Sequence, residues 1–384
     1  MARIAVCGYM IRYPLAGMVL AYFHYLLGLH RLGHQVFYCE ESGWPGSCYN
    51  PTTDTSGDDP TFGLQNLKTL MQRFGLDFPV CYIERETGRI HGLERQELKR
   101  MLGESDLLLN IGGVCWLSEF RLCRRRALID MDPFFTQIGH MGLEGFDEYH
   151  TYFSYGTNIG REGCTIPTNG IHWVPTFPPV VPEIWSRQQS EETIDDQPRD
   201  VFTTVANWKA YGEATYNGEM YGQKDKEFVR FLMLPRRVVQ KLELALSGAG
   251  PDTIEQLSRA GWLPINSGDI SSDISSYLNY IIRSRGEFSV AKNAYVKTRS
   301  GWFSDRSVCY LAAGLPVILQ DTGFTDRLTG GKGILFFSSI DEAADCIHNV
   351  NANYAEHRAM AARIAREVFS YKVVLPRIIE AGCA

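Results

Sequence analysis

The chain has 384 residues, which is more than one hydrophobic core usually supports, so we expect two domains. Hydrophobic residues make up 45% and charged residues 21% of the sequence, and this globular composition excludes a disordered chain, a fibre and a coiled coil. With 38 Lys and Arg against 44 Asp and Glu, the formal net charge of -6 argues against a broad electrostatic grip on nucleic acid or anionic lipid, although a local basic groove stays open.

The cysteines and the lack of a targeting pattern both indicate a protein of the cytoplasm. The 10 cysteines show no C-x-x-C spacing, and several lie in apolar runs, so we expect buried free thiols, a cytoplasmic protein and no metal site. The N-terminus lacks the apolar core of a signal peptide, and the apolar stretch 18–29 is too short to span a membrane.

The first half alternates strands and helices in the pattern of a doubly wound α/β domain. Strands are expected over residues 3–8, 35–39, 106–111 and 126–130, and helices over 18–32, 64–74 and 93–101. The stretch 41–59 is rich in Gly, Pro, Asp and Thr and is predicted to be a loop. Four prolines within 173–185 predict an extended connector, and we place the domain boundary there and in the polar stretch 188–199.

The second half repeats the α/β plan without a detectable sequence repeat. Strands are expected over 201–205, 240–246, 288–291, 316–319 and 333–337, and helices over 226–232, 251–260, 274–284, 305–313, 339–350 and 352–369. This half holds the most informative stretch, residues 284–324.

A candidate anion site lies where the loop 300–304 leads into the helix expected from Asp305. Exposed N–H groups and hydroxyls at a helix start favour anions, and three cations lie nearby in the sequence. A buried strand then ends at two polar residues, and ligands of open α/β sheets bind beyond such strand ends. The candidate residues are Ser304 and Ser307, the cations Lys297, Arg299 and Arg306, and the strand-end residues Gln320 and Asp321.

The run from Gly301 through Gly323, with A-A-G-L-P-V at 312–317, resembles the donor-binding region of GT-B glycosyltransferases. The resemblance implies two facing Rossmann-like domains with an interdomain cleft and a C-terminal helix that crosses back. It assigns 1–178 to an acceptor-binding domain, 179–199 to a linker, 200–365 to a nucleotide-sugar-binding domain and 366–384 to the returning helix. Two positions that are acidic in many members are Gly301 and Cys309 here, so Asp305 or Glu287 is the alternative partner for the ribose.

The resemblance also marks the loop after the first strand of the second domain and the segment that packs on the nucleobase. In that loop Lys224 is the predicted contact to the donor diphosphate, with Trp208, Gly222 and Gln223 beside it. Trp262, in G-W-L-P, is the predicted aromatic contact to the base.

Candidates in the first half follow its strands. The loop 8–17 lacks the G-x-G-x-x-G spacing of a dinucleotide site, while Arg12 and Gly17 are possible contacts to an anionic group and to the transferred sugar. Asp130 and Asp132 follow a buried strand and His140 lies in a Gly-flanked loop, so these three are candidates for the base that deprotonates the acceptor.

The sequence therefore predicts a glycosyltransferase that moves a sugar from a UDP-, dTDP- or GDP-sugar to an acceptor without a metal or other cofactor. A small-molecule or glycan acceptor is favoured over nucleic acid because of the acidic net charge. Three alternatives stay open: a nucleotide-sugar epimerase, a sugar phosphorylase of the same fold, and a noncatalytic two-domain binding protein. Inversion or retention at the sugar carbon is not decided by the sequence.

Overall fold

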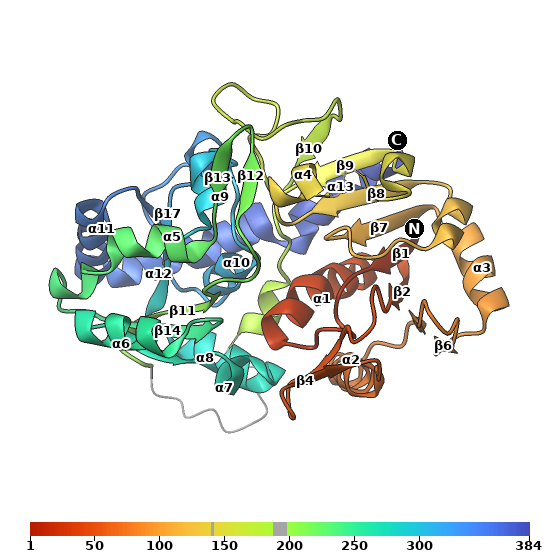
Figure 1. Ribbon diagram of the computed structural model, residues 1–384, viewed down its shortest axis with the longest axis horizontal. Helices are drawn as coiled ribbons and strands as arrows, with labels where there is room; N and C mark the ends of the chain where they lie inside the picture. The colour runs from red at the N-terminus through yellow and green to blue at the C-terminus, as the bar shows by residue number, and fades with distance from the viewer. Residues whose placement is uncertain (140–141, 187–197) are drawn as a thin grey trace. The chain divides into compact units, whose positions relative to one another are not determined.

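The computed structural model describes residues 1–139, 142–186 and 198–384 and divides the chain into two compact units (Figure 1). Unit 1 comprises Met1–Gly156, Pro167–Pro179 and Tyr371–Ala384. Unit 2 comprises Thr157–Ile166 and Val180–Ser370. A short excursion of the N-terminal part of the chain, Thr157–Ile166, thus belongs to the second unit.

Unit 1 is built on an eight-stranded sheet in the order β10-β9-β8-β7-β1-β2-β5-β6. All neighbours pair in parallel except β5 and β6, and the buried central strand pairs Val6 with Tyr38 on one side and Leu109 on the other. From β5 to β9 the strands follow the doubly wound order 3-2-1-4-5-6. The strands are β1 (Arg3–Cys7), β2 (Gln35–Glu41), β5 (Val80–Ile83), β6 (Ile90–His91), β7 (Leu107–Ile111), β8 (Arg126–Asp130), β9 (Thr151–Ser154) and β10 (Trp173–Pro175).

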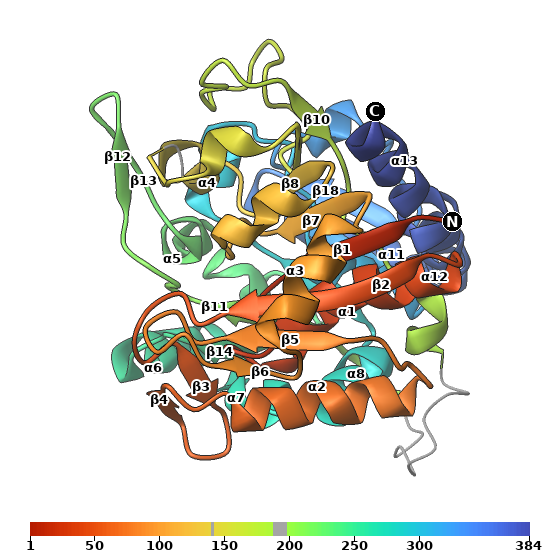
Figure 2. The same ribbon diagram turned by 90° about the vertical axis from the view of Figure 1, so that its right-hand side faces the viewer.

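The helices of unit 1 include the last helix of the chain, α13 (Tyr371–Cys383), which contacts α1 (Ala16–Arg31) and β7. A Cβ atom at Gly28 would lie 2.6 Å from the Leu375 side chain, so this glycine lets the two helices approach closely. The other helices are α2 (Thr61–Arg73), α3 (Arg95–Gly103), which lies in front of the sheet in Figure 2, and α4 (Phe135–Gly139), with 3-10 turns η1 (Ser118–Leu122) and η2 (Phe146–Glu148).

Two expectations for unit 1 are wrong. The predicted loop 41–59 contains the hairpin β3 (Cys48–Asn50) and β4 (Thr55–Gly57). The proline-rich connector begins with a strand, β10, which pairs with β9 at the edge of the sheet, and ends with the 3-10 turn η3 (Pro182–Trp185). Proline is compatible with an edge strand, since one of its sides needs no ladder hydrogen bond.

Unit 2 has a six-stranded, fully parallel sheet in the order β15-β14-β11-β16-β17-β18. This is again the order 3-2-1-4-5-6, which confirms the prediction of two Rossmann-like domains. The strands are β11 (Val201–Asn207), β14 (Lys241–Ser247), β15 (Leu263–Asn266), β16 (Gly286–Ser289), β17 (Val317–Gln320) and β18 (Ile334–Phe337), and a separate hairpin holds β12 (Ala214–Tyr216) and β13 (Glu219–Tyr221).

Helices cover both faces of the unit 2 sheet, as the doubly wound order requires. They are α5 (Lys224–Phe228), α6 (Pro251–Ala260), α7 (Gly268–Ser271), α8 (Ile274–Arg283), α9 (Asn293–Lys297), α10 (Asp305–Ala312), α11 (Ile340–Ala352) and α12 (Tyr354–Ile364), with short turns η5 (Val229–Phe231), η6 (Leu234–Arg236) and η7 (Phe324–Asp326) and the π-helical turn η8 (Ala365–Phe369). The strand expected at 288–291 begins two residues earlier, at Gly286, and ends at Ser289, so it includes the buried Glu287.

Within the described residues, no helix is long and apolar enough to cross a membrane. The same part of the chain holds no cluster of metal-binding side chains, and its ten cysteines are free.

Candidate active site

The strand order of unit 2 reverses between β11 and β16, so the carboxyl ends of these two strands lie at the topological switch point, where doubly wound sheets bind ligands. The carbonyl of Val205, the hydroxyl of Ser289 and the carbonyl of Val290 lie at these ends. Each of the three accepts a hydrogen bond from a cationic side chain. The sequence motifs that surround α10 and α5 therefore meet at the switch point of the sheet.

Arg306, in the first turn of α10, ties both strands to the helix. Its Nε donates to Glu287 at 2.7 Å, Nη1 to the Val205 carbonyl at 2.6 Å and Nη2 to Ser289 Oγ at 2.8 Å. Burial is the largest single influence and lowers the pKa of Arg306, but the fully buried Glu287 carboxylate and the nearby phenols of Tyr277 and Tyr310 together raise it above its ordinary value. Arg306 therefore has a structural role at this site, and its charge is already paired with Glu287.

Lys224, the first residue of α5, is the second buried cation, with 8% of its surface exposed. Its Nζ donates to the Val290 carbonyl at 2.5 Å, and no carboxylate of the described residues lies within ion-pair distance of it. Burial, and then the repulsion of Arg306, lower the pKa of Lys224 from 10.5 to about 7, with Glu287 acting in the opposite direction. The ammonium therefore lacks a neutralising contact that an anionic ligand would supply.

A carboxylate-centred network positions the helix that carries Lys224. Glu227, one turn further along α5, accepts from Gln320 Nε2 at 2.6 Å through one oxygen and from Asn293 Nδ2 at 2.8 Å through the other. Gln320 Oε1 in turn accepts the Ala291 amide at 3.1 Å. Gln320, at the end of β17, therefore binds helix α5 through Glu227 and helps to position Lys224, the first residue of that helix.

The start of α10 has the features expected of a capped helix. Ser304 Oγ accepts the Arg306 amide at 3.2 Å as the N-cap, and burial raises the pKa of Asp305 in the same turn. Ser307 Oγ is fully buried and has no hydrogen-bond partner among the described residues. The first turn of α10 thus combines a capped Arg306 amide with an Asp305 carboxyl group whose charge is disfavoured by burial.

The loop before α10 is held by the excursion Thr157–Ile166. Asn158 Nδ2 donates to the carbonyls of Gly323 at 2.8 Å and Arg299 at 3.2 Å, and Thr157 Oγ1 donates to the Gly301 carbonyl at 2.9 Å. The loop needs left-handed backbone at Arg299 (φ 50) and Gly301 (φ 73). A Cβ atom at Gly301 would lie 2.5 Å from Thr157 Oγ1, so glycine is required there.

Several predicted donor residues have other roles. Trp262 is a core residue, 2% exposed, which packs against Phe228 and Phe288, so the predicted contact to a base is wrong in this structure. Lys297 is tied to the β12–β13 hairpin through Glu219 at 2.7 Å. Asp321 accepts the Gly323 amide at 2.8 Å and is a turn residue.

The loop residues beside Lys224 lie near it but are bound to the protein. The Gly222 amide donates to Asn293 Oδ1 at 3.1 Å, and the Gln223 carbonyl accepts the Asn293 amide at 3.2 Å. Trp208 follows β11, is half-buried and packs on Phe228 at 5.1 Å. Their contribution to donor binding stays a prediction.

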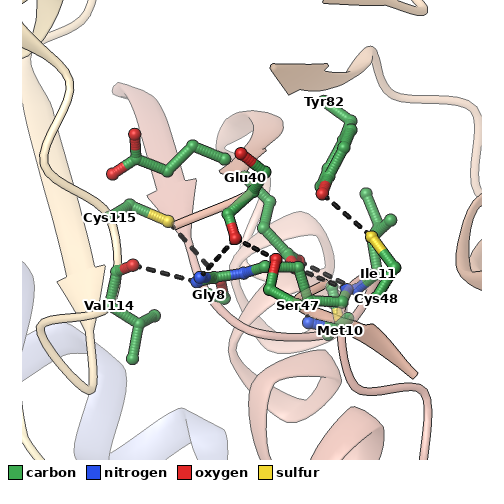
Figure 3. A network of polar contacts seen from close by, with 12 residues as sticks. Gly8, Met10, Ile11, Glu40, Ser47, Cys48, Tyr82, Val114 and Cys115 are labelled. Carbon is green, nitrogen blue, oxygen red and sulfur yellow. Dashed lines mark hydrogen bonds and ion pairs between the residues drawn. The ribbon is translucent and has the colours of Figure 1, made fainter. Parts of the chain in front are cut away.

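The corresponding switch point of unit 1 is filled by the protein itself (Figure 3). Glu40 accepts the amides of Met10, Ile11 and Arg12 at 2.8, 2.9 and 2.7 Å. Arg12 is 1% exposed, and its guanidinium donates to Glu40 at 3.3 Å and to the Val114 carbonyl at 2.9 Å. Arg12 is therefore a structural residue that closes the loop after β1, and the expected contact to an anionic ligand is wrong.

The three predicted bases are separated by the structure. Asp130 is fully buried and accepts bonds from Ser154 Oγ at 2.6 Å, Gln137 Nε2 at 2.9 Å and the Asp132 amide at 2.9 Å, so it organises the turn after β8 and is unsuited to deprotonate an acceptor. Asp132 is half-buried beyond the strand end, and His140 lies outside the described residues. Gly17 is in the first turn of α1.

Sequence analysis missed Glu227 and Asn158, and it named Glu287 as a partner for the ribose, whereas the structure pairs Glu287 with Arg306. Glu287 carried a signal, since a glutamate inside an otherwise apolar strand needs a buried counter-charge. Glu227 and Asn158 carried none, because the partners described above are 66 and 93 positions from Glu227 and 141 and 165 positions from Asn158.

Two Rossmann-like units with buried cations at the switch point of the second define the GT-B architecture. Residues 233–374 match a family model described as "Glycosyl transferase-like". No curated protein matches the chain in sequence.

Solved structures of glycosyltransferases share the fold over the whole chain. AviGT4, a glycosyltransferase involved in avilamycin A biosynthesis, is 13% identical with a TM-score of 0.55, covering 99% of this chain and 97% of that one. An alpha-glucosyltransferase (AGT) in complex with UDP is 10% identical with a TM-score of 0.62 and full coverage of both chains. Alr3699/HepE of Anabaena, in complex with UDP and glucose, is 10% identical with a TM-score of 0.56 and 99% coverage of both.

The chain therefore has the fold of GT-B glycosyltransferases, and its residues 233–374 match the glycosyl transferase-like family model. Most of the family match, residues 233–370, lies in unit 2 and includes Arg306, whereas Lys224 precedes it in the chain.

Proposed function

We propose that the chain transfers a sugar from a UDP-sugar to the hydroxyl of an acceptor, with the nucleotide sugar bound by unit 2 and the acceptor by unit 1. The observation that carries this proposal is Lys224, a buried ammonium without a carboxylate contact among the described residues, at the switch point of the sheet. A nucleoside diphosphate is the anion that such a switch point suits. AGT and HepE, which share the fold, bind UDP and UDP-glucose, and this supports uridine over other bases.

The two cations have different roles in this proposal. Lys224 contacts the diphosphate directly and stabilises the negative charge that develops as the sugar leaves. Arg306 acts through its three protein contacts, which hold α10 and the carboxyl ends of β11 and β16 in place. The start of α10 adds partial positive charge, so the departing diphosphate is stabilised by fixed protein charges without a required metal.

The acceptor hydroxyl loses its proton during transfer. If the reaction inverts the sugar carbon, Asp132 and His140 are the remaining candidates for the base, since Asp130 is sequestered. We infer a cytoplasmic protein from its ten cysteines, none of which forms a disulfide within the described residues and seven of which are buried.

Thermal unfolding with UDP, dTDP, GDP and ADP tests donor binding. A ligand present at about 100 times its Kd stabilises the folded state by about 2.7 kcal/mol. We expect UDP to raise the unfolding temperature and the other three to do so less. No shift with any nucleotide contradicts the assignment of unit 2 as the donor unit.

A matched pair of lysine variants tests the role of Lys224. Lys224→Met removes the buried ammonium, whereas Lys226→Met removes an exposed one two residues away that pairs with Glu213 at 2.7 Å. We expect the UDP-dependent shift to disappear in Lys224→Met and to persist in Lys226→Met. Equal shifts in both variants would refute the contact while leaving the fold class intact. Transfer from UDP-sugar to product, followed by mass spectrometry with and without EDTA, then tests catalysis and its independence of metal.

A further inference from the structure

Unit 1 contains a pocket that none of the roles above uses. Its volume is about 420 Å³, within the range of small-molecule sites. Three segments supply most of its lining: the end of β5 and the residues after it, the segment after β7 that runs into η1, and the stretch around η2. The first residues of α3 and β8, Arg95 and Arg126, complete the lining. A cavity of this size holds a ligand of one or two sugar rings.

An aromatic residue, Trp116, lines this pocket and is fixed by contacts to other residues of unit 1. Its amide donates to the fully buried Glu41 carboxylate, and its ring contacts Tyr149 edge-on at 5.9 Å and Phe146 at 6.1 Å. The tryptophan itself is half-buried. A ring fixed in this way offers an apolar face of the kind that packs on the C–H face of a sugar ring.

The charged residues of the wall balance each other. Four arginines and four glutamates line the pocket: Arg85, Arg95, Arg121, Arg126, Glu84, Glu119, Glu144 and Glu148. Two of the arginines are paired with glutamates of the wall, since Arg95 meets Glu119 at 2.7 Å and Arg121 Nε lies 2.9 and 2.8 Å from the two oxygens of Glu148. Arg126 donates to main-chain carbonyls instead. A phosphate would have to displace carboxylates from these guanidinium groups, which makes an anionic ligand unfavourable.

A polyhydroxylated ligand has no such conflict. A paired guanidinium keeps free N–H donors and a paired carboxylate keeps free lone pairs, and each sugar hydroxyl both donates and accepts. Arg85, which lies 3.3 Å from the buried Glu41, connects this polar wall to the residue that holds Trp116. The pocket thus combines a fixed aromatic ring with arginine–glutamate ion pairs that can still donate and accept hydrogen bonds.

We propose that this pocket binds a neutral saccharide portion of the acceptor. The inference rests on the proposed function for its role in transfer, but the binding of the saccharide is independent of the donor. It names the acceptor class as a neutral glycan and sets this chain apart from a neighbour whose structure contains DNA.

The test uses the full chain on an array of neutral hexose oligosaccharides, uronic acid oligosaccharides and a short DNA duplex, without nucleotide. We expect binding to neutral oligosaccharides only. Trp116→Ala should weaken that binding roughly tenfold, the factor that about 1.4 kcal/mol of aromatic contact represents. Trp116→Phe should retain more of it, and Trp44→Ala, at an exposed tryptophan of the same unit that is outside the pocket lining, should retain all of it.

Each outcome decides the matter. Binding that survives Trp116→Ala unchanged, or that is confined to uronic acid oligosaccharides or DNA, overturns the inference. If Trp116→Ala does not fold, Arg121→Ala replaces it, because this exposed arginine should be dispensable for folding and is expected to reduce binding several-fold. No array binding by a protein that still shows the UDP-dependent shift overturns the inference alone, whereas loss of both also removes the proposed function.

Discussion

Replacing Lys224 by methionine should make the protein more stable at low pH and less stable at high pH. Burial lowers the pKa of this lysine from 10.5 to about 7. At about 1.4 kcal/mol for each pKa unit, the lowering corresponds to roughly 4 to 5 kcal/mol of unfavourable charge burial. A methionine of similar length removes that cost but leaves the Val290 carbonyl without its donor, which costs about 1 to 3 kcal/mol.

The sign of the effect follows from proton binding. Between about pH 7 and pH 10 the unfolded chain holds the proton on Lys224 and the folded chain does not, so the stability of the natural protein rises with pH through this group. Below about pH 7 both states are protonated and the full cost is present. Lys224→Met should therefore be about 2 to 3 kcal/mol more stable near pH 6.5, and about 1 to 3 kcal/mol less stable near pH 10, where the neutral amine still donates to Val290.

Guanidinium unfolding followed by tryptophan fluorescence at several pH values measures this crossover. Lys226→Met is the matched control, since its exposed ammonium pairs with Glu213 and its removal should shift the curves little at any pH. If the midpoint of an unfolding transition changes in Lys224→Met and not in Lys226→Met, that transition is the unfolding of unit 2. Parallel pH profiles for the natural protein and Lys224→Met would refute the reasoning, because they would mean that the ammonium carries no burial cost.

Three further outcomes follow from the same site. Glu287→Ala leaves the Arg306 guanidinium buried without its carboxylate and should lower the free energy of unfolding by about 3 to 5 kcal/mol, while Glu287→Gln should cost less; equal midpoints in denaturant would contradict the pairing. Asn158→Ala removes the donor of two loop carbonyls and should cost about 2 kcal/mol, measured in the same way, with an unchanged midpoint counting against the anchoring role. The UDP-dependent shift in unfolding temperature should shrink as pH rises above about 7, because Lys224 loses the proton that the diphosphate needs, and a pH-independent shift would exclude that contact.

The regular parts of the fold were predictable because their signals are local. α6 coincides with its prediction over Pro251–Ala260, since proline at its start and left-handed Gly261 at its end are backbone signals that act within a few residues. α10 and the strand that follows it were found in the same way. The hairpin at Cys48–Asn50 and Thr55–Gly57 was missed because its strands are short, carry little apolar alternation and are defined by their pairing with each other.

The site was predictable only as far as charge and position in the chain could indicate it. Lys224 was predicted as the contact to the donor diphosphate and Arg306 as one of three cations near the start of α10, yet the structure pairs Arg306 with Glu287 and leaves Lys224 to a carbonyl. Sequence position cannot distinguish these cases, since the difference depends on which strand end the side chain reaches. The same reason explains why the prediction of Asp130 as a base failed. Its carboxylate lies at a strand end, where a base could act, but it accepts hydrogen bonds from Ser154 and Gln137. A polar residue at a strand end is thus a candidate for ligand binding only once its protein partners are known, and by that criterion Lys224 is the predicted donor residue that most needs a ligand.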